Sequence, residues 1–485
     1  MNKPIRILAI GCLVLFLLLL ANINYIQVLK AGDYNDRGDN RRARDAECSR
    51  KRGPILVGRD SVARSVPSDD DLAYLRTYSR PMLYAPVTGF FSCIYGTKQV
   101  ENSENSILSG SDSRLFVNRF IDLLGNQNPS GGSVLLTINP KAQQAAWDGL
   151  DALPGETRGA VVALDPKTGA ILAMVSAPSY DPNRIASHDV DAATQAYQEL
   201  SESRDKKMLN RASSEIYPPG STFKLVTAAA ALSNDYTPDS IVKGGTSLDL
   251  PLTSEDLHNE NGGDCGGDRI TLTQALVVSC NVSFGDLGLE LGAAKLRAQA
   301  EAFGFNEDPL DELTSASSNF PTDMDAPSTA LSAIGQYDVA ASPLQMAMVA
   351  AGIANGGDVM KPYVVQEVRS PDLDVLDEAQ PEVLHQAVSG SVASDLTQMM
   401  VEVVEQGTGT QTQIPGISVA GKTGTANSSE QRSPYAWMVT FAPADDPQVA
   451  VAVLIEHTDV SRDVISGGGL AGPIAREVME AVIDR

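Results

Sequence analysis

The N-terminal segment has the longest apolar run in the chain. About 23 uncharged residues, 7–29, follow Lys3 and Arg6, and a helix of this length can cross the hydrocarbon layer of a membrane. The end of the run lacks the small-residue pattern at which signal peptides are cleaved. We therefore expect residues 1–29 to form a cytoplasmic tip and a retained transmembrane anchor.

The charges around this segment do not settle its orientation. Two basic residues precede it, whereas five follow it between positions 30 and 44. Basic residues near a membrane helix favour the cytoplasmic side, but long domains cross membranes largely regardless of such charges. Because of the chemistry that residues 30–485 carry, we expect them to lie outside the cytoplasm.

Residues 30–154 mix short alternating runs with polar stretches. The pattern at 52–58 predicts a strand. Pro140 is placed to open an Ala- and Gln-rich helix that continues to about Leu153. We expect an elongated, strand-containing pedestal domain, which ends near Pro154.

Residues 155–485 have the pattern of one α+β domain. Two β runs at 159–165 and 170–176 flank a glycine-containing turn, which predicts a hairpin. A second strand pair is predicted at 435–442 and 448–456, and Ala-rich helical segments lie between the two pairs. Strands at both ends of a sequence with helices between them are typical of an antiparallel sheet flanked by helices.

The composition of the chain excludes several classes of protein. The chain has 485 residues and 43% apolar content, which is enough for a packed core. Its 37 Lys and Arg residues against 61 Asp and Glu give a net charge of -24, the wrong sign for binding nucleic acid. The four histidines are isolated and the five cysteines scattered, so we predict no metal site and no cofactor.

The first candidate for chemistry is the segment 218–224, Pro-Pro-Gly-Ser-Thr-Phe-Lys. If Ser221 begins a helix, the amine of Lys224 lies beside its hydroxyl one turn later. The apolar residues that follow predict burial, which lowers the pKa of a lysine and lets it accept a proton. This is the pairing of nucleophile and base in covalent catalysis. Ser203 and Lys206 have the same spacing, but their charged surroundings predict a solvated surface.

Ser279 and Asn281 form a second candidate. They follow an apolar run two residues apart, and a hydroxyl and a carboxamide at this spacing can point into one cleft from a turn. The same pattern recurs at 103–105 and 317–319, so it is weak on its own.

The third candidate is the segment 421–425, Gly-Lys-Thr-Gly-Thr, which includes Lys422. On a strand, Thr423 and Thr425 would share one face, and Gly424 would leave room for a ligand to approach the backbone. This motif is less expected by chance than the other two.

Taken in order, the three motifs resemble the set of penicillin-binding proteins and serine β-lactamases. The resemblance covers about residues 155–485. The anchor and the segment that begins at Arg52 are similar to the start of a class B penicillin-binding protein, in particular of the actinobacterial penicillin-binding protein A branch. The alternative, in which Ser221 only caps a helix and Lys422 is only a surface charge, does not explain three motifs in matching contexts.

The resemblance implies a D,D-transpeptidase that cross-links peptidoglycan stem peptides in cell-wall synthesis and is inhibited by β-lactams. It implies that Ser221 attacks the carbonyl of the penultimate D-Ala and that Lys224 takes the proton of Ser221. Ser279 and Lys422 would pass a proton to the leaving amine.

The resemblance also implies the residues that bind the substrate. Asn281 would hold the amide of the donor peptide, and Thr423, Gly424 and Thr425 would line the site of its terminal carboxylate. The backbone N–H groups of Ser221 and Thr425 would form the oxyanion hole.

Two other functions remain open. One is a hydrolase on the same scaffold, a D,D-carboxypeptidase or a β-lactamase, although no separate carboxylate for activating water can be identified by spacing. The other is a penicillin-binding scaffold or sensor without turnover. Residues 30–154 are unlike a glycosyltransferase, so the resemblance implies a separate SEDS-type membrane glycosyltransferase as partner.

The cysteines predict two disulfides if the domain is exported, because thiols pair in an oxidising compartment. We predict the pair Cys265–Cys280, which would close a loop of about 15 residues and stabilise the protein by roughly 3 kcal/mol. The alternative is that Cys280 is a small buried residue without a partner. Cys48 and Cys93 are a second predicted pair.

Overall fold

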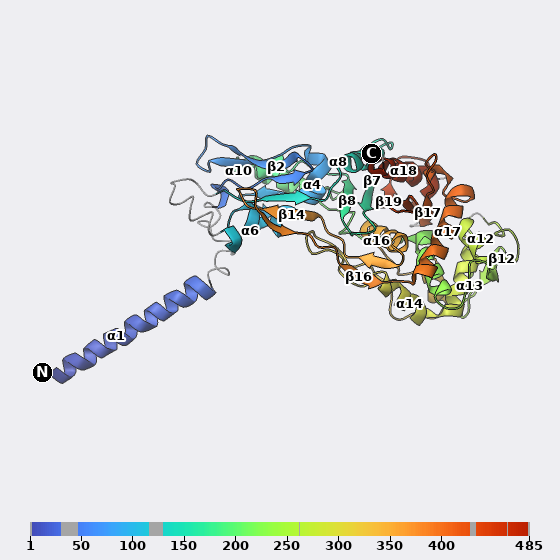
Figure 1. The fold of residues 1–485 in the computed structure, drawn as a ribbon, viewed down its shortest axis with the longest axis horizontal. Coiled ribbons are helices and arrows are strands. Elements are labelled where there is room, and N and C mark those ends of the chain that lie inside the picture. The colour runs from blue at the N-terminus through green and yellow to red at the C-terminus, as the bar shows by residue number, and fades with distance from the viewer. Residues whose placement is uncertain are drawn as a thin grey trace.

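The computed structural model describes residues 2–30, 47–115, 130–260, 262–426, 433–462 and 464–483. They form an N-terminal helix, a membrane-proximal domain on a six-stranded sheet, and a larger domain on a five-stranded sheet (Figure 1). Of the five basic residues that follow the anchor in the sequence, those after Lys30 lie outside the described residues.

The N-terminal helix is α1 (Asn2–Asn24), which continues into the π-helical turn η1 (Tyr25–Leu29). Residues 3–27 are long and apolar enough to cross a membrane, and none of the described apolar window is buried inside the protein. The helix extends away from both domains (Figure 1). An isolated helix that satisfies its own backbone and exposes apolar side chains suits a lipid environment, which is consistent with the predicted single-pass anchor.

The sheet of the larger domain has the strand order β17-β18-β19-β7-β8, and all neighbouring strands are antiparallel. Both hairpins predicted from the sequence are present, and β19 pairs with β7 where the two hairpins meet. The predicted α+β fold with an antiparallel sheet is therefore confirmed. The strands are β7 (Arg158–Leu164), β8 (Ile171–Ala177), β17 (Ala420–Ala426), β18 (Tyr435–Ala442) and β19 (Val449–His457).

Helices cover both faces of this sheet, which explains why its central strands are apolar at most positions. In β19, Val451 and Val453 belong to the core on one face, and Ala452 and Leu454 to the core on the other. One face packs against α8 and α18, and the other against α16. These helices are α8 (Pro140–Asp151), α16 (Pro343–Ala354) and α18 (Gly472–Ile483).

A helical region lies beside the edge strand β17. Its centre is α11 (Lys224–Leu232), every residue of which is buried, as the apolar sequence predicts. α11 packs against α13, α14 and α17, and α17 packs against β17, so segments almost 200 residues apart in the sequence meet here. The helices are α12 (Leu272–Val277), α13 (Asn281–Leu291), α14 (Ala293–Ala302), α15 (Ala326–Ser332) and α17 (Gly390–Gln406).

The membrane-proximal sheet has the order β15-β14-β6-β1-β2-β3, in which only the β1 and β6 pair is parallel. Its strands are β1 (Ile55–Val57), β2 (Asp60–Pro67), β3 (Tyr74–Tyr78), β6 (Ser133–Leu136), β14 (Val365–Arg369) and β15 (Val375–Glu378).

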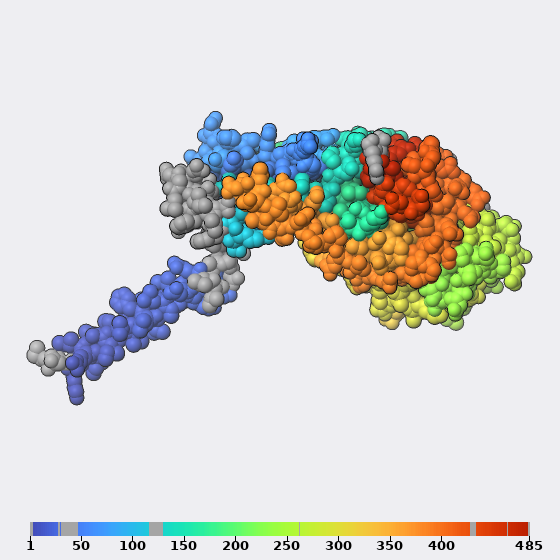
Figure 2. All heavy atoms as spheres, viewed as in Figure 1, coloured from blue at the N-terminus to red at the C-terminus, as the bar shows by residue number. Residues whose placement is uncertain are grey.

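Two parts of the chain do not follow the domain boundary predicted near Pro154. The helix α8 precedes it in the sequence but packs against α18 and β8 of the larger domain. Conversely, β14 and β15 come from residues 365–378 and complete the membrane-proximal sheet. Figure 2 shows this orange segment lying against the blue N-terminal part of the surface. The chain thus passes from the larger domain back to the membrane-proximal one.

A buried ionic cluster supports the membrane-proximal domain. The carboxylate of Glu101 accepts hydrogen bonds from Arg52 at 2.8 Å, from Arg76 at 2.6 Å and from the hydroxyl of Tyr78 at 3.0 Å. Burial alone would raise the pKa of Glu101, but the two arginines outweigh it and the pKa is lowered. Removing either arginine would leave the buried negative charge of Glu101 with one positive partner instead of two, which would destabilise the folded protein.

Shorter elements complete the fold. Those of the membrane-proximal domain are α4 (Pro81–Thr88), β4 (Phe91–Ser92), β5 (Gly96–Thr97), α5 (Val100–Ser103), α6 (Asn105–Leu108) and η2 (Ser113–Leu115). The others are α9 (Asn183–Ala186), α10 (Val190–Ser201), β9 (Ile241–Lys243), β10 (Ser247–Asp249), β11 (Asp256–His258), β12 (Arg269–Thr271), β13 (Asp358–Met360), β16 (Val383–Gln386), η4 (Thr410–Thr412) and η5 (Gly467–Ala471).

Candidate active site

The three sequence motifs meet at one cleft of about 910 Å³. Ser221 lies in the 3-10 turn η3 (Gly220–Phe223), Ser279 lies between α12 and α13, and Lys422 lies on β17. The sequence predicted that the helix begins at Ser221, but the α-helix begins at Lys224. The separation of three residues still places the two side chains side by side, because a 3-10 turn also brings residues i and i+3 together.

The amine of Lys224 faces the hydroxyl of Ser221. Its Nζ lies 3.0 Å from Ser221 Oγ and donates to the carbonyl oxygen of Ser279 and to Asn281 Oδ1, each at 2.7 Å. A neutral lysine amine has two hydrogens and one lone pair. These two oxygens can take both hydrogens, which directs the lone pair at Ser221 Oγ. The geometry therefore suits a base that removes the proton of Ser221.

Burial adjusts the basicity of both lysines in the cleft. The side chain of Lys224 is fully buried, and burial together with the positive charge of Lys422 lowers its pKa well below the ordinary value. Burial lowers the pKa of Lys422 to about 7. The negative charge of Glu260 opposes both shifts. Two buried lysines in a cleft, each with a strongly lowered pKa, are typical of a functional site.

Ser279 connects the two lysines. Its Oγ accepts a hydrogen bond from Lys422 Nζ at 2.9 Å and lies 3.3 Å from Lys224 Nζ. The backbone of Ser279 has φ of +58°, a left-handed conformation that residues other than glycine rarely adopt. Strained backbone of this kind is concentrated at functional sites, and here it presents both the hydroxyl and the carbonyl of Ser279 to Lys224.

The strand β17 forms one wall of the cleft, and Thr423 and Thr425 line it, as expected for positions on one strand face. Gly424 is also needed for the packing of β17. A Cβ at this position would lie 2.9 Å from Thr222 Cγ2 and 3.0 Å from the carbonyl oxygen of Pro219. The glycine therefore makes room for the turn that carries Ser221.

Several residues of the cleft were not predicted from the sequence, among them the following three. Asn259 and Glu260 line it from the loop after β11, and Thr408 lines it from the segment after α17. The Thr408 hydroxyl lies 2.5 Å from that of Thr423, which orients a side chain of the third motif. No motif in the sequence marks these positions, since tertiary folding alone brings them to the cleft.

Both predicted disulfides are present. Cys265 pairs with Cys280, with a Cα–Cα distance of 5.7 Å, and Cys48 pairs with Cys93 at 5.8 Å. The first bridge ties the loop after β11 to the middle residue of the Ser-x-Asn motif. The alternative Ser-x-x-Lys spacing lies on the surface, where the exposed amine of Lys206 pairs with Glu215 at 2.8 Å.

The chain matches known protein families over most of its length. Residues 159–480 match the penicillin binding protein transpeptidase domain, and residues 52–134 match the penicillin binding protein A dimerisation domain. The chain therefore belongs to the family of penicillin-binding protein transpeptidases.

Individual relatives are similar over nearly the whole chain. The peptidoglycan D,D-transpeptidase PbpA of Mycolicibacterium smegmatis is 45% identical over 489 residues, which cover 100% of this chain and 99% of the relative. Penicillin-binding protein A from M. tuberculosis, solved as its penicillin G acyl-enzyme complex, is 43% identical with a TM-score of 0.85, covering 90% of this chain and 100% of that one. Its imipenem acyl-enzyme complex matches with 43% identity and a TM-score of 0.86, covering 90% and 99%.

Proposed function

We propose that this protein cross-links peptidoglycan stem peptides as a serine D,D-transpeptidase and that β-lactams acylate it at Ser221. The observation that carries the proposal is the 3.0 Å contact between Ser221 Oγ and the buried amine of Lys224. The relatives named as peptidoglycan D,D-transpeptidases and the structures of β-lactam acyl-enzymes support it.

In the first half of the reaction, Ser221 Oγ attacks the carbonyl carbon of the penultimate D-Ala, and Lys224 Nζ accepts the hydroxyl proton. The C–N bond to the terminal D-Ala then breaks and leaves an ester on Ser221. The departing amine takes a proton through Ser279 Oγ, which lies within reach of Lys224 and Lys422. Such proton transfers contribute about 10² to 10⁴ in rate.

In the second half, a primary amine of a neighbouring stem peptide attacks the ester. A C–N bond forms, the bond to Ser221 Oγ breaks, and the proton of the amine returns to Ser221 through Lys224. The positions of the remaining residues support their roles in binding. Asn281 contacts the amine of the proposed base, Lys224, while Thr423 and Thr425 line the cleft beside Lys422, whose charge would hold a carboxylate. The N–H groups of Ser221 and Thr425 would stabilise the oxyanion.

The arrangement in the cell follows from this chemistry. Peptidoglycan lies outside the cytoplasmic membrane, so we place residues 30–485 outside and the anchor, residues 1–29, in the membrane. The pedestal, residues 30–154, would set the distance between membrane and cleft, and residues 155–485 would carry the reaction. A SEDS-type glycosyltransferase in the same membrane would supply the glycan strands.

The acylation step is tested with the full-length chain in detergent. After incubation with labelled penicillin, peptide mapping by mass spectrometry should place the label on Ser221, and Ser221→Ala should remove it. Ser203→Ala is the matched control, because it changes the serine of the other Ser-x-x-Lys spacing, and it should leave the label unchanged. A label on Ser203, or no label on the wild-type protein, would overturn the proposal.

The alternatives of a D,D-carboxypeptidase, a β-lactamase or a scaffold without turnover share this acylation and differ in what resolves the ester. An acyl-D-Ala-D-Ala donor is therefore incubated with the protein, with and without a primary amine. A transpeptidase converts the product from acid to amide when the amine is present. Acid alone indicates a hydrolase, and an ester that persists with the amine indicates a scaffold.

A further inference from the structure

The helix that carries Asn281 depends on a distant residue for its N-terminal cap. The first backbone N–H groups of a helix have no acceptor within the helix, and a side chain at the N-cap position often supplies one. The N-cap residue of α13 is Cys280, which makes no capping hydrogen bond among the described residues because its sulfur is bonded to Cys265.

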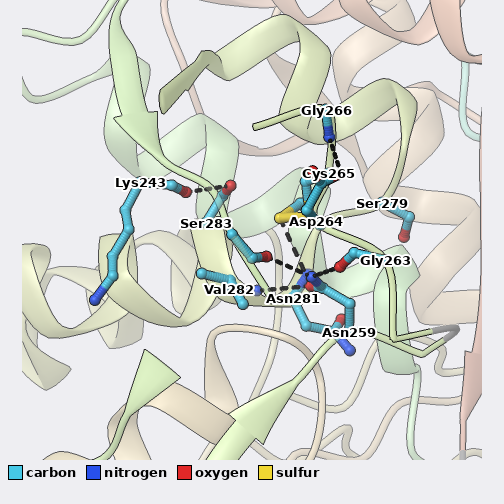
Figure 3. Close-up of a disulfide and its surroundings, with 12 residues drawn as sticks. Lys243, Asn259, Gly263, Asp264, Cys265, Gly266, Ser279, Asn281, Val282 and Ser283 are labelled. Atoms are coloured by element: carbon cyan, nitrogen blue, oxygen red, sulfur yellow. Dashed lines mark hydrogen bonds between the residues drawn. A yellow bond between two sulfur atoms is a disulfide. The ribbon is translucent and has the colours of Figure 1, made fainter. Parts of the chain in front are cut away.

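Asn259 supplies the missing acceptor. Its Oδ1 accepts hydrogen bonds from the backbone N–H groups of Asn281 at 3.0 Å and Val282 at 3.2 Å (Figure 3). Its Nδ2 donates to the carbonyl oxygens of Gly245 at 2.9 Å and Gly263 at 2.6 Å. Both hydrogens of the amide and both acceptor positions of its oxygen are used, so its orientation is fixed.

The residue before Asn259, His258 at the end of β11, also holds the side chain of Asn281. Asn281 Nδ2 donates to the carbonyl oxygen of His258 at 3.0 Å, while Oδ1 accepts from Lys224 Nζ at 2.7 Å. Two consecutive residues, the last of β11 and the first of the loop after it, therefore fix the backbone and the amide of Asn281, which accepts a hydrogen bond from Lys224. The disulfide Cys265–Cys280 ties the far end of the loop to the same motif.

We propose that Asn259 is a positioning residue for the reaction. Acting through Asn281, it fixes one of the two oxygens that direct the lone pair of Lys224 at Ser221 Oγ. This inference rests on the proposed function, since it assigns Lys224 the role of base. Asn259 itself need not touch the reacting atoms, because its effect passes through one backbone and one side-chain hydrogen bond of Asn281.

The expected effect follows from how strongly proton transfer depends on geometry. A misplacement of about 1 Å in a reacting group can cost about 10² in rate. Asn259→Ala removes the oxygen that accepts both hydrogen bonds at the start of α13, while the disulfide and the His258 carbonyl remain, so the displacement of Asn281 should be less than about 1 Å. We expect the second-order rate constant of penicillin acylation to fall about 10-fold.

A double-mutant cycle tests whether the effect passes through Asn281. The full-length chain in detergent is prepared as wild type, Asn259→Ala, Asn281→Ala and the double variant, and acylation by labelled penicillin is timed. If Asn259 acts through Asn281, its removal should slow acylation less than about 2-fold in the Asn281→Ala background. An equal loss in both backgrounds, or no loss in either, would overturn the inference.

Two further variants separate positioning from stability. Thr271→Ala removes the side-chain cap of the adjacent helix α12, where Thr271 Oγ1 accepts from the N–H of Gln274 at 3.1 Å. It should lower the melting temperature without changing acylation. Asn259→Asp keeps acceptors for the Asn281 and Val282 N–H groups but loses the donors to Gly245 and Gly263, so it should recover part of the rate that Asn259→Ala loses. Equal losses of acylation in Thr271→Ala and Asn259→Ala would refute positioning, as would an Asn259→Asp variant that acylates no faster than Asn259→Ala at an equal or higher melting temperature.

If Asn259→Ala does not fold, Asn259→Ser takes its place in the cycle, because its shorter side chain cannot reach both N–H groups. Failure of the proposed function looks different. In that case the wild-type protein itself is not labelled at Ser221, whereas failure of this inference leaves wild-type acylation intact.

Discussion

The role of Lys224 as base is tested most directly by Lys224→Met. Methionine is close to lysine in length and keeps the apolar stem, but it has no amine. The variant loses the contact with Ser221 Oγ and the donors to the Ser279 carbonyl and to Asn281 Oδ1. Because the side chain of Lys224 is fully buried, water cannot readily replace the lost amine.

Two magnitudes follow from this geometry. Removing a general base costs about 10² to 10⁴ in rate, which corresponds to about 3–5 kcal/mol in the activation free energy of acylation. Each buried acceptor left unpaired costs about 1–3 kcal/mol in folding free energy. The variant no longer has to bury an amine, which offsets part of that cost. We therefore expect a folded protein whose acylation is at least about 100-fold slower.

The assay is the time course of penicillin labelling at several concentrations, with the melting temperature measured on the same samples. Lys206→Met is the matched control, because it makes the same change in the surface Ser-x-x-Lys spacing, where the lysine side chain is 62% exposed. It should acylate at the wild-type rate. If Lys224→Met acylates within about 3-fold of wild type, or if Lys206→Met loses as much, the base lies elsewhere.

Two more predictions concern the surroundings of the nucleophile. Cys265→Ser opens the loop that the bridge to Cys280 closes, and it should lower the free energy of unfolding by up to about 3 kcal/mol. The variant should therefore have a lower melting temperature and acylate more slowly. An unchanged melting curve would contradict this prediction. Lys422 has a pKa of about 7, so its charge is lost as the pH rises through that value. The dissociation constant for the penicillin carboxylate should therefore increase above about pH 7, and a constant value from pH 6 to 9 would show that Lys422 does not hold the carboxylate.

Local spacing explains which parts of the site could be predicted from the sequence. Ser221 and Lys224 are three residues apart, so their contact follows from almost any helical turn. The strand face shared by Thr423 and Thr425 is equally local. Even the pair Cys265–Cys280 followed from proximity in the sequence and an oxidising compartment.

Positions fixed by long-range packing could not be predicted. Asn259 lies 22 residues before Asn281 in a loop with no regular pattern, and its function appears only once the loop folds onto α13. Gly424 was correctly placed on a strand, but the sequence did not indicate that the turn of Ser221 packs against it. Periodicity in a sequence shows which side chains share a strand face, but it does not show what packs against that face. For the same reason, nothing in residues 365–378 indicated that they pair with a sheet formed more than 200 residues earlier.

That last pairing has a consequence for how the protein is made. During synthesis from the N-terminus, β6 (Ser133–Leu136) is complete long before its neighbour β14 (Val365–Arg369) exists. Until then the sheet has an open edge whose N–H and C=O groups can pair with another chain. Nascent chains that stall between these two strands should therefore aggregate or require a holding chaperone, whereas chains that extend beyond Arg369 can close the edge themselves.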